Sequence, residues 1–219
     1  MTVTLPTLRW ERQLLRAHPL VIACDEVGRG ALAGPVAVGA AVVSAAHARR
    51  RIPEGLRDSK LVPERRRGDV ATRAAAWADA SAVGWASAAE VDAEGIIRAL
   101  GLAAHRALAS LRAQGVDLAA GVVVLDGNHD YISPVAAVGA PVMPRIKADR
   151  DCASAAAASV VAKVARDAYM VALHDECPPY AWERNKGYAS ETHRTAIAAH
   201  GLSVHHRASW AIAGAPTLF

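Results

Sequence analysis

Three short apolar runs in separate parts of the chain each lead to acidic residues. These acidic residues are Asp25 with Glu26, then Asp126, and finally Asp149. If the runs are strands of an open α/β sheet, their ends lie in one crevice, where functional side chains gather. Carboxylates gathered there repel one another, and a divalent cation relieves that repulsion. Because the set offers only oxygen ligands, it predicts Mg²⁺ or Mn²⁺ rather than zinc.

Carboxylates that converge from separate segments suit phosphodiester cleavage. Two metal ions about 4 Å apart can activate a water and stabilise the leaving oxygen. The simpler alternative is that these acids are solvated loop residues. There is also a geometric difficulty, because adjacent strand residues point to opposite faces. Asp25 and Glu26 share one site only if the strand has ended or twisted there, or if one contributes its backbone carbonyl, and Gly28 favours an early end.

A glycine-rich segment, residues 28–34, follows the first two acids. Its loose GxGxxxG spacing suggests a dinucleotide-binding loop, but such a loop should open a helix. Here it leads through Pro35 into a Val-rich run typical of a strand, so we reject that interpretation. Glycines instead let the backbone come very close to a ligand. Arg29 could meet a phosphate, and the backbone could sense a ribose 2′-hydroxyl, which distinguishes RNA from DNA.

The apolar periodicity predicts the elements that must position these residues. Strands are expected at residues 20–24, 35–43, 82–87, 122–125 and 142–146. Helices are expected at residues 8–17, 69–80, 88–114, 153–175 and 191–200. This order suits a mixed α/β sheet covered by helices, with a small helical C-terminal part. The break at Pro178 and Pro179 is the best boundary, dividing the chain into a catalytic domain, 1–177, and an appendage, 178–219.

Composition excludes several classes of protein. Of 219 residues, 53% are hydrophobic and 21% are charged, which allows a sizeable core and argues against disorder. The net charge of +4 is compatible with a polyanionic partner. The three cysteines show no CxxC or Cys–His spacing, so we expect reduced thiols in a cytoplasmic protein. No uncharged apolar run reaches about 18 residues, so we expect no membrane span.

Five sequence blocks resemble one known family. Residues 25–36, DEVGRGALAGPV, closely resemble the signature of bacterial ribonuclease HII. The other blocks, in the family's order, are RDSK at 57–60, LDGN at 125–128, KAD at 147–149 with AAASVVAKVARD at 156–167, and Gly187-Tyr188 with His193 and HHRASW at 205–210. They extend over roughly residues 20–210. Because five blocks in order are a specific signal, the chain is identified as a member of this family.

The resemblance implies both the fold and the chemistry. The fold would be RNase H-like, an α/β mixed five-stranded sheet flanked by helices with a small helical C-terminal part. The catalytic, metal-binding residues would be Asp25, Glu26, Asp126 and Asp149, holding two Mg²⁺ or Mn²⁺ ions. The substrates would be RNA–DNA hybrids and ribonucleotide-containing duplex DNA. The enzyme would cut 5′ to a ribonucleotide, even a single one, and leave a 3′-hydroxyl and a 5′-phosphate, as in ribonucleotide and primer removal.

The resemblance also implies the residues that bind substrate. Gly28, Arg29 and Gly30 would read the 2′-hydroxyl. Tyr188 would stack at the RNA–DNA junction. Lys60, Ser159 and Lys163 would bind phosphate or support the site. We expect His193 to position the Tyr188 loop rather than bind metal. A substrate contact by His129 stays open. The arginine clusters at 49–51 and 65–67 are interpreted as solvated faces, with contact to a nucleic-acid backbone as the alternative.

Two other functions remain to be weighed. One is a binding module that grips hybrid duplexes without cutting them, which would have no use for clustered carboxylates beside a phosphate backbone. The other is a two-metal nuclease of the same fold that acts on DNA alone, against which the GRG triplet and Tyr188 argue by resemblance. We expect a monomer. A clamp-binding peptide is not evident, because the C-terminal stretch 216–219 is too short to identify one.

Overall fold

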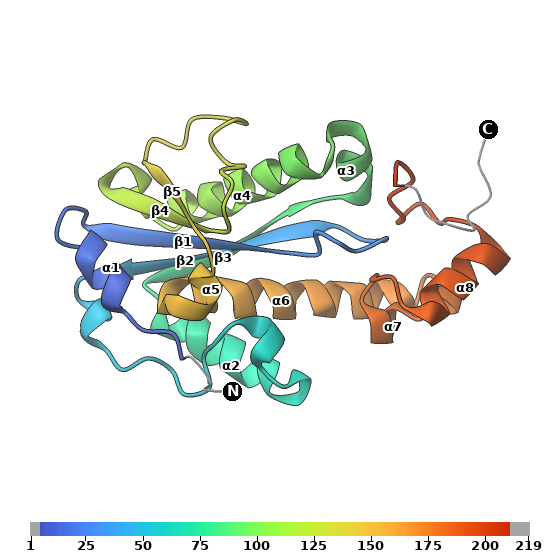
Figure 1. Cartoon of the computed structure of the whole chain (residues 1–219), viewed down its shortest axis with the longest axis horizontal. Helices are drawn as coiled ribbons and strands as arrows, with labels where there is room; N and C mark the ends of the chain where they lie inside the picture. The colour runs from blue at the N-terminus through green and yellow to red at the C-terminus, as the bar shows by residue number, and fades with distance from the viewer. Residues whose placement is uncertain (1–4, 211–219) are drawn as a thin grey trace.

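A computed structural model describes residues 5–210 and contains a mixed five-stranded sheet with helices on both faces (Figure 1). The strands are β1 (Leu20–Val27), β2 (Val36–Ser44), β3 (Ala80–Ala86), β4 (Gly121–Asp126) and β5 (Val142–Arg145). Their order across the sheet is β3-β2-β1-β4-β5. The predicted mixed sheet of five strands is therefore confirmed, with strand ends displaced by a few residues.

The direction of the strands brings two of the acidic segments to one edge. β1 pairs antiparallel with β2, which in turn pairs antiparallel with β3. On its other side β1 pairs parallel with β4, where Cys24 lies opposite Leu125, and β4 pairs parallel with β5. Because β1 and β4 run in the same direction, their carboxyl ends meet at the same edge of the sheet.

The helices cover the two faces of the sheet. Their bounds are α1 (Arg9–Leu14), α2 (Glu64–Trp77), α3 (Ala88–Glu94), α4 (Ile96–Ala113), α5 (Ala148–Asp151), α6 (Ala153–His174), α7 (Trp182–Asn185) and α8 (Glu191–His200). In Figure 1, α3 and α4 lie above the sheet, while α2, α5 and α6 lie below it. The sheet is thus the middle layer of three, and each of its faces is buried.

Alternation along the strands divides the core into two layers. Ile22 and Leu125 point to one face and pack with Leu100 and Leu108 of α4. Ala23 belongs to the other face, which packs against the Ala-rich start of α6. The small alanine side chains of α6 let this long helix lie close to the central strands, where it positions the residues that follow.

The predicted single helix at 88–114 was wrong. Gly95, with φ of 78°, divides it into α3 and α4. The Ser87 side chain accepts the backbone N–H of Glu90, and the Glu90 side chain accepts that of Ser87, which fixes the start of α3. The helix predicted at 69–80 begins earlier, because α2 starts at Glu64, directly after Pro63, and it ends at Trp77.

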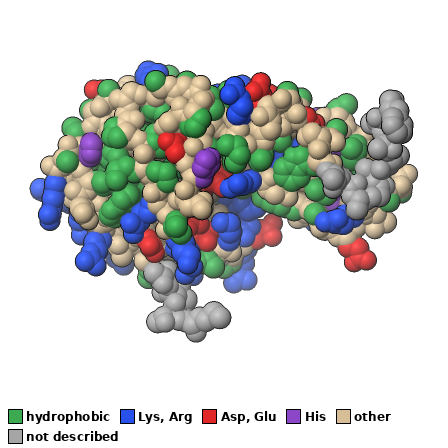
Figure 2. Space-filling view, turned by 45° about the horizontal axis from the view of Figure 1, so that its top comes forward, with side chains coloured by type: hydrophobic (Ala, Val, Ile, Leu, Met, Phe, Trp, Pro, Cys, Tyr) green, Lys and Arg blue, Asp and Glu red, His purple; other side chains and the backbone are tan. Residues whose placement is uncertain are grey.

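The C-terminal part extends beyond the sheet at one end of the molecule, where α7 and α8 lie (Figure 1). It packs on the far half of α6 and on the β1–β2 loop, through Leu32, Met170, Trp182 and Ile197. None of the helices in the described residues is long and apolar enough to cross a membrane. Figure 2 shows Lys and Arg side chains spread over the face in view, with Asp and Glu side chains among them.

Candidate active site

Asp25 and Glu26 lie inside β1, so the expected early end of this strand was wrong. β1 continues to Val27, and both acids stay paired with β2. Asp25 shares the face of Ala23, toward α6, and is only 4% exposed. Glu26 points to the opposite face, where the Tyr131 hydroxyl donates a hydrogen bond to its Oε2 at 3.4 Å. Both nevertheless line one cleft, because the cleft opens at the end of the strand.

Asp126 and Asp149 lie next to each other beside the same edge. Asp126 was expected directly after its strand and is instead the last residue of β4. Asp149 does not directly follow β5; the chain turns through Lys147, with φ of 61°, and Asp149 lies in the first turn of α5. The backbone N–H of Asp149 donates to Oδ1 of Asp126 at 3.3 Å, which holds the two residues together. Asp149 is buried and Asp126 is half-buried.

The four carboxyl groups form one electrostatically coupled cluster. Burial is the largest cause that raises the pKa of each of them. The charges of Glu26 and Asp126 raise the pKa of Asp25 further. Burial and then the charge of Asp126 raise the pKa of Asp149 to about 6. The ammonium group of Lys60 acts in the opposite direction on Glu26, Asp126 and Asp149, because a nearby positive charge favours the ionised form.

This donor set fits a hard divalent cation. The cluster offers only carboxylate oxygens, and its members disfavour one another's charged form. In the described residues, no three His, Cys, Asp or Glu side chains already converge on one point as the ligands of a single ion. His129 is exposed in the loop after β4. The arrangement therefore provides the charge for cation binding, while the final coordination geometry depends on side-chain rotation.

Lys60 is held over the acidic cluster by a short turn. The Asp58 side chain accepts the backbone N–H of Lys60 at 3.0 Å, and Lys60 Nζ lies 3.6 Å from Oδ2 of Asp149. Ser159 of α6 anchors this turn, since its hydroxyl donates to Oγ of Ser59 at 3.0 Å. Ser159 is 3% exposed and stands behind the turn rather than on the cleft surface. Its position therefore suits support of the site, one of the two roles expected of it.

The cleft itself has a volume of about 470 Å³. It is lined by Asp25, Glu26, Val27, Gly28, Arg29, Gly30, Ser59, Lys60, Arg67, Lys163 and Tyr188. The predicted site residues that do not line it are Asp126, Asp149 and Ser159. The first two adjoin it through Lys60, so the structure brings the sequence-predicted residues to one place on the molecule.

Gly28 and Gly30 of the glycine-rich loop have different surroundings. Gly28 has φ of 84°, and a Cβ there would lie 2.1 Å from Nε of Arg166. A Cβ on Gly30 would meet nothing within 4 Å. The fold thus requires glycine at position 28, whereas position 30 is open toward the cleft. The loop backbone is held by Arg207, whose guanidinium donates to the carbonyls of Gly28 at 2.7 Å and Arg29 at 2.9 Å.

Two buried arginines support this loop, and sequence reasoning had given neither a role. Arg166 of α6 donates to the carbonyls of Pro35 at 2.8 Å, Lys186 at 3.0 Å and Ala33 at 3.2 Å. Arg166 and Arg207 are fully buried, and their donors are used on backbone carbonyls. The sequence did contain a signal for Arg166, since it lies in an Ala-rich helix that is predicted to be buried. An unpaired charge is not tolerated in such a place, so a buried partner could have been expected.

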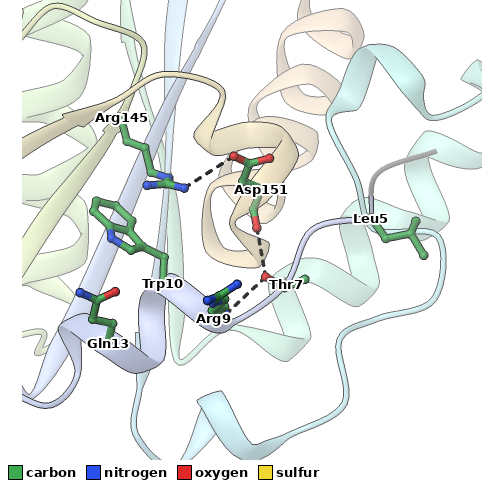
Figure 3. Close-up of a pocket in the computed structure, with 7 residues that line it drawn as sticks. All are labelled: Leu5, Thr7, Arg9, Trp10, Gln13, Arg145 and Asp151. Atoms are coloured by element: carbon green, nitrogen blue, oxygen red, sulfur yellow. Dashed lines mark hydrogen bonds and ion pairs between the residues drawn. The ribbon is translucent and has the colours of Figure 1, made fainter. Parts of the chain in front are cut away.

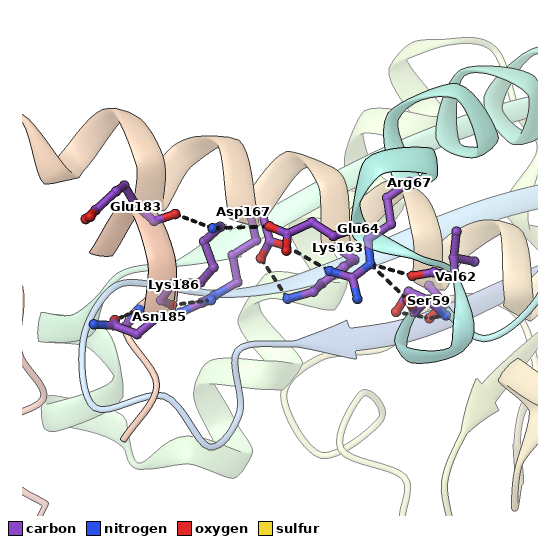
Figure 4. Close-up of polar contacts among 12 residues, drawn as sticks. Ser59, Val62, Glu64, Arg67, Lys163, Asp167, Glu183, Asn185 and Lys186 are labelled. Atoms are coloured by element: carbon purple, nitrogen blue, oxygen red, sulfur yellow. Dashed lines mark hydrogen bonds and ion pairs between the residues drawn. The ribbon is translucent and has the colours of Figure 1, made fainter. Parts of the chain in front are cut away.

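Arg67 was also missed, because its cluster was interpreted as a solvated face. Its Nε donates to the carbonyls of Ser59 at 3.1 Å and Val62 at 3.0 Å. Its Nη1 lies 3.8 Å from Asp167, which also accepts a hydrogen bond from Lys163 Nζ at 2.7 Å (Figure 4). Arg67 therefore joins the Lys60 turn to α6 and, with Arg29, Lys60 and Lys163, is one of the four cationic residues that line the cleft.

Tyr188 stands at the end of the cleft nearest the C-terminal part. Two cations of α6 lie near its ring, with Lys163 Nζ 5.5 Å and Arg166 Cζ 5.3 Å from the ring centroid. Both distances are within the range of cation–π attraction. The ring is half-buried and faces the cleft, so one side of it remains available to a ligand.

His193 positions the loop of Tyr188, as expected. Its Nδ1 donates to the Tyr188 carbonyl at 2.9 Å, and its Nε2 accepts from Trp182 Nε1 at 3.1 Å. The backbone N–H of Ser203 donates to Nδ1 of His206 at 2.9 Å, so His206 carries its proton on Nε2 and donates it to His193 Nε2 at 3.0 Å. This tautomer assignment, read from the hydrogen-bond pattern, satisfies every ring nitrogen of both neutral, buried histidines.

Comparisons with known proteins agree on one family. The family model of ribonuclease HII matches residues 22–213. A ribonuclease HII from Streptomyces griseus is 45% identical over 196 residues, which is 87% of this chain and 77% of that protein.

Solved structures agree on the fold. The PCNA:RNase HII complex from Archaeoglobus fulgidus matches with a TM-score of 0.69 and 22% identity, over 87% of this chain and 95% of that one. Bst-RNase HIII in complex with Mn²⁺ matches with a TM-score of 0.67 and 21% identity, over 89% of this chain and 65% of that one. The expected RNase H-like fold is thus confirmed.

Proposed function

Because the chain belongs to the ribonuclease HII family and is therefore a ribonuclease H, we propose that it cuts on the 5′ side of ribonucleotides, including single ones embedded in duplex DNA. Longer RNA–DNA hybrids would be substrates too, and the products would carry a 3′-hydroxyl and a 5′-phosphate. The observation that carries this proposal is the cleft at the ends of β1 and β4. It combines clustered carboxylates, an exposed glycine backbone, four cationic side chains and an aromatic ring.

We further propose that Asp25, Glu26, Asp126 and Asp149 hold two Mg²⁺ or Mn²⁺ ions. When bound, such ions lower the pKa of water and stabilise the leaving oxygen of a phosphodiester. The four carboxylates supply the ligand oxygens, and their mutual repulsion is the physical reason for binding a cation there. Carboxylate rotation completes the coordination, since three ligands do not yet converge in the described residues.

Recognition of RNA would depend on the backbone of residues 28–30. Arg207 holds the carbonyls of Gly28 and Arg29, so these groups are fixed before substrate arrives. The space above Gly30 is open, which allows a sugar to approach the backbone. A ribose 2′-hydroxyl can both donate and accept a hydrogen bond there, and deoxyribose cannot. Tyr188 would then stack on the sugar or base at the adjoining junction.

The cations of the cleft have distinct proposed roles. Lys60 lies against Asp149 at 3.6 Å, where it can bind the scissile phosphate and limit repulsion between phosphate and carboxylates. Lys163 and Arg67 share Asp167 and stand between Lys60 and Tyr188, which suits a neighbouring phosphate. Ser159 would act from behind, by fixing Ser59 and so the turn that carries Lys60.

The test is cleavage of a labelled DNA duplex that carries one ribonucleotide. The wild type, Asp126→Asn and the matched control Asp69→Asn, an exposed acid on α2, are compared with Mg²⁺, with Mn²⁺ and with chelator. We expect a metal-dependent cut 5′ to the ribonucleotide by the wild type and the control, and no cut by Asp126→Asn. Full activity of Asp126→Asn would contradict the assigned carboxylate cluster.

The same assay separates the other candidate functions. Cutting of long hybrids but not of the single ribonucleotide would restrict the proposal to hybrid cleavage. Cutting of an all-DNA duplex would favour a DNA nuclease of the same fold. Tight binding of the hybrid by a folded protein that cuts neither substrate would favour the binding module. The division into a catalytic domain, 1–177, and a substrate-binding appendage, 178–219, remains part of this proposal.

A further inference from the structure

A second pocket, of about 510 Å³, lies outside the cleft (Figure 3). Its walls come from α1, from the segment before it, from the edge strand β5 and from the end of α5. The lining residues are Leu5, Thr7, Arg9, Trp10, Gln13, Arg145 and Asp151. We refer to it as the Arg9–Arg145 pocket.

This pocket adjoins the carboxylate cluster on the side away from the cleft. Arg145 is the register partner of Asp126 in the parallel pair of β4 and β5, so both side chains project from the same face. Asp151 lies two residues beyond Asp149 in the single turn of α5. The pocket therefore begins one strand away from the acids.

The acids lie between this pocket and Tyr188. Tyr188 belongs to the C-terminal part at one end of the long axis, whereas α1 and α5 lie toward the other end (Figure 1). Three separate contacts are made in this region: Lys163 with the Tyr188 ring, Lys60 with Asp149, and Arg145 with Asp151. A duplex that crosses the acids from Tyr188 leads toward the Arg9–Arg145 pocket.

The chemistry of the pocket suits a phosphate group. The guanidinium of Arg145 stacks on Trp10, 4.4 Å from the ring centroid, and lies 3.6 Å from Asp151. Stacking fixes the guanidinium plane, which leaves its fork of donors ready for an anion. Arg9 is exposed and forms no ion pair with another described residue. Two guanidinium groups against one carboxylate leave the pocket positively charged, and the amide of Gln13 adds a neutral donor.

We propose that the Arg9–Arg145 pocket binds a backbone phosphate of the duplex arm that leaves the active site on the side opposite Tyr188. This inference rests on the proposed nucleic-acid substrate. It assigns a binding role to residues outside the cleft and predicts that the length of one arm matters. A phosphate contact there carries no sequence information but fixes the register of the duplex on the enzyme.

The test measures binding without cleavage. Fluorescence anisotropy of a labelled ribonucleotide-containing duplex, in chelator and in the Asp126→Asn background, gives Kd as a function of salt. Arg9→Ala and Arg145→Ala should each weaken binding roughly 3- to 10-fold and reduce the slope of log K against log salt by about 0.9. The control Arg112→Ala removes an exposed arginine from α4, on the other face of the sheet, and should change neither quantity.

Two further measurements make the outcome specific. Asp151→Asn should tighten binding, because it removes the carboxylate that competes for Arg145. When each arm is shortened in turn, the effect of Arg9→Ala should vanish for one arm and persist for the other. Because Arg9 is exposed, its replacement leaves the stack of Arg145 on Trp10 in place.

The results separate the two proposals. Normal binding by the Asp126→Asn background, with unchanged Kd and salt slope in both arginine variants, would overturn the pocket inference alone. An effect of Arg9→Ala that persists when both arms are short would do the same. Failure of the folded background to bind any ribonucleotide-containing duplex would overturn the proposed function together with this inference.

Discussion

Alanine at Gly28 and alanine at Gly30 should have opposite consequences, although the two positions are two residues apart. A Cβ at Gly28 would lie 2.1 Å from Nε of Arg166, and the backbone there has φ of 84°. A left-handed backbone costs alanine about 1–2 kcal/mol. Displacing Arg166 from even one of its carbonyl partners costs roughly 1.5–3 kcal/mol more, because the guanidinium is buried.

For Gly28→Ala we therefore expect the free energy of unfolding to fall by about 2.5–5 kcal/mol. For Gly30→Ala we expect a change of less than about 1 kcal/mol, since the new methyl group meets nothing within 4 Å. Activity should behave differently. Gly30→Ala should lose cleavage at a single ribonucleotide while remaining fully folded, because the methyl group occupies the space through which the ribose approaches the backbone.

The assay combines urea unfolding, followed by tryptophan fluorescence, with cleavage of the single-ribonucleotide duplex at a temperature where both variants are folded. Gly68→Ala, at an exposed helical position with open space around it, is the matched control. It should leave cleavage unchanged and raise the free energy of unfolding by about 0.5–1 kcal/mol, because alanine is the better helix former. Wild-type stability of Gly28→Ala would refute the packing of Arg166 against this loop. Wild-type cleavage by folded Gly30→Ala would refute the close approach of the ribose.

Three other predictions follow from the C-terminal part. Arg207→Lys should lower stability by roughly 2–4 kcal/mol, because a lysine cannot donate to the Gly28 and Arg29 carbonyls together; urea unfolding measures this, and an unchanged midpoint would contradict it. His193→Ala should raise KM for the junction substrate several-fold more than it lowers kcat, because it frees the Tyr188 carbonyl; equal KM values would argue against the positioning role. Burial lowers the pKa of His206 to about 4, so the folded state binds fewer protons than the unfolded state between about pH 6.5 and 4. The free energy of unfolding should fall by up to about 3 kcal/mol as the pH drops through that window. Urea unfolding at a series of pH values should show a smaller fall for His206→Gln than for the wild type over the same window.

The strands and most helices could be predicted because their signals are local. Alternating or continuous β-branched runs identify strands whatever they pair with, and this placed all five strands. The split at Gly95 was not predictable in the same way. An isolated glycine in a helical pattern is usually tolerated, and its φ of 78° results from how α3 turns onto α4.

The acidic residues could be identified from sequence, but their geometry could not. The pattern of an apolar run followed by an acid marked Asp126, and the family resemblance marked all four. Whether β1 ended before Asp25 depended on its pairing with β2, which continues through Val27. The opposite orientations of Asp25 and Glu26, and the contact of Glu26 with Tyr131, follow from that pairing.

By itself the sequence determined the residue types that do chemistry, the elements that carry them and, through five ordered blocks, the family. The tertiary structure decided what holds these residues in place. Arg166 and Arg207 bind backbone carbonyls far away in the chain. Arg67 binds the Ser59 carbonyl and lines the cleft, whereas its neighbours Arg65 and Arg66 are exposed. Because a backbone carbonyl is present at every residue, such partners leave no pattern in the sequence. They exist only once the segments have packed together, and the Arg9–Arg145 pocket depends on packing in the same way.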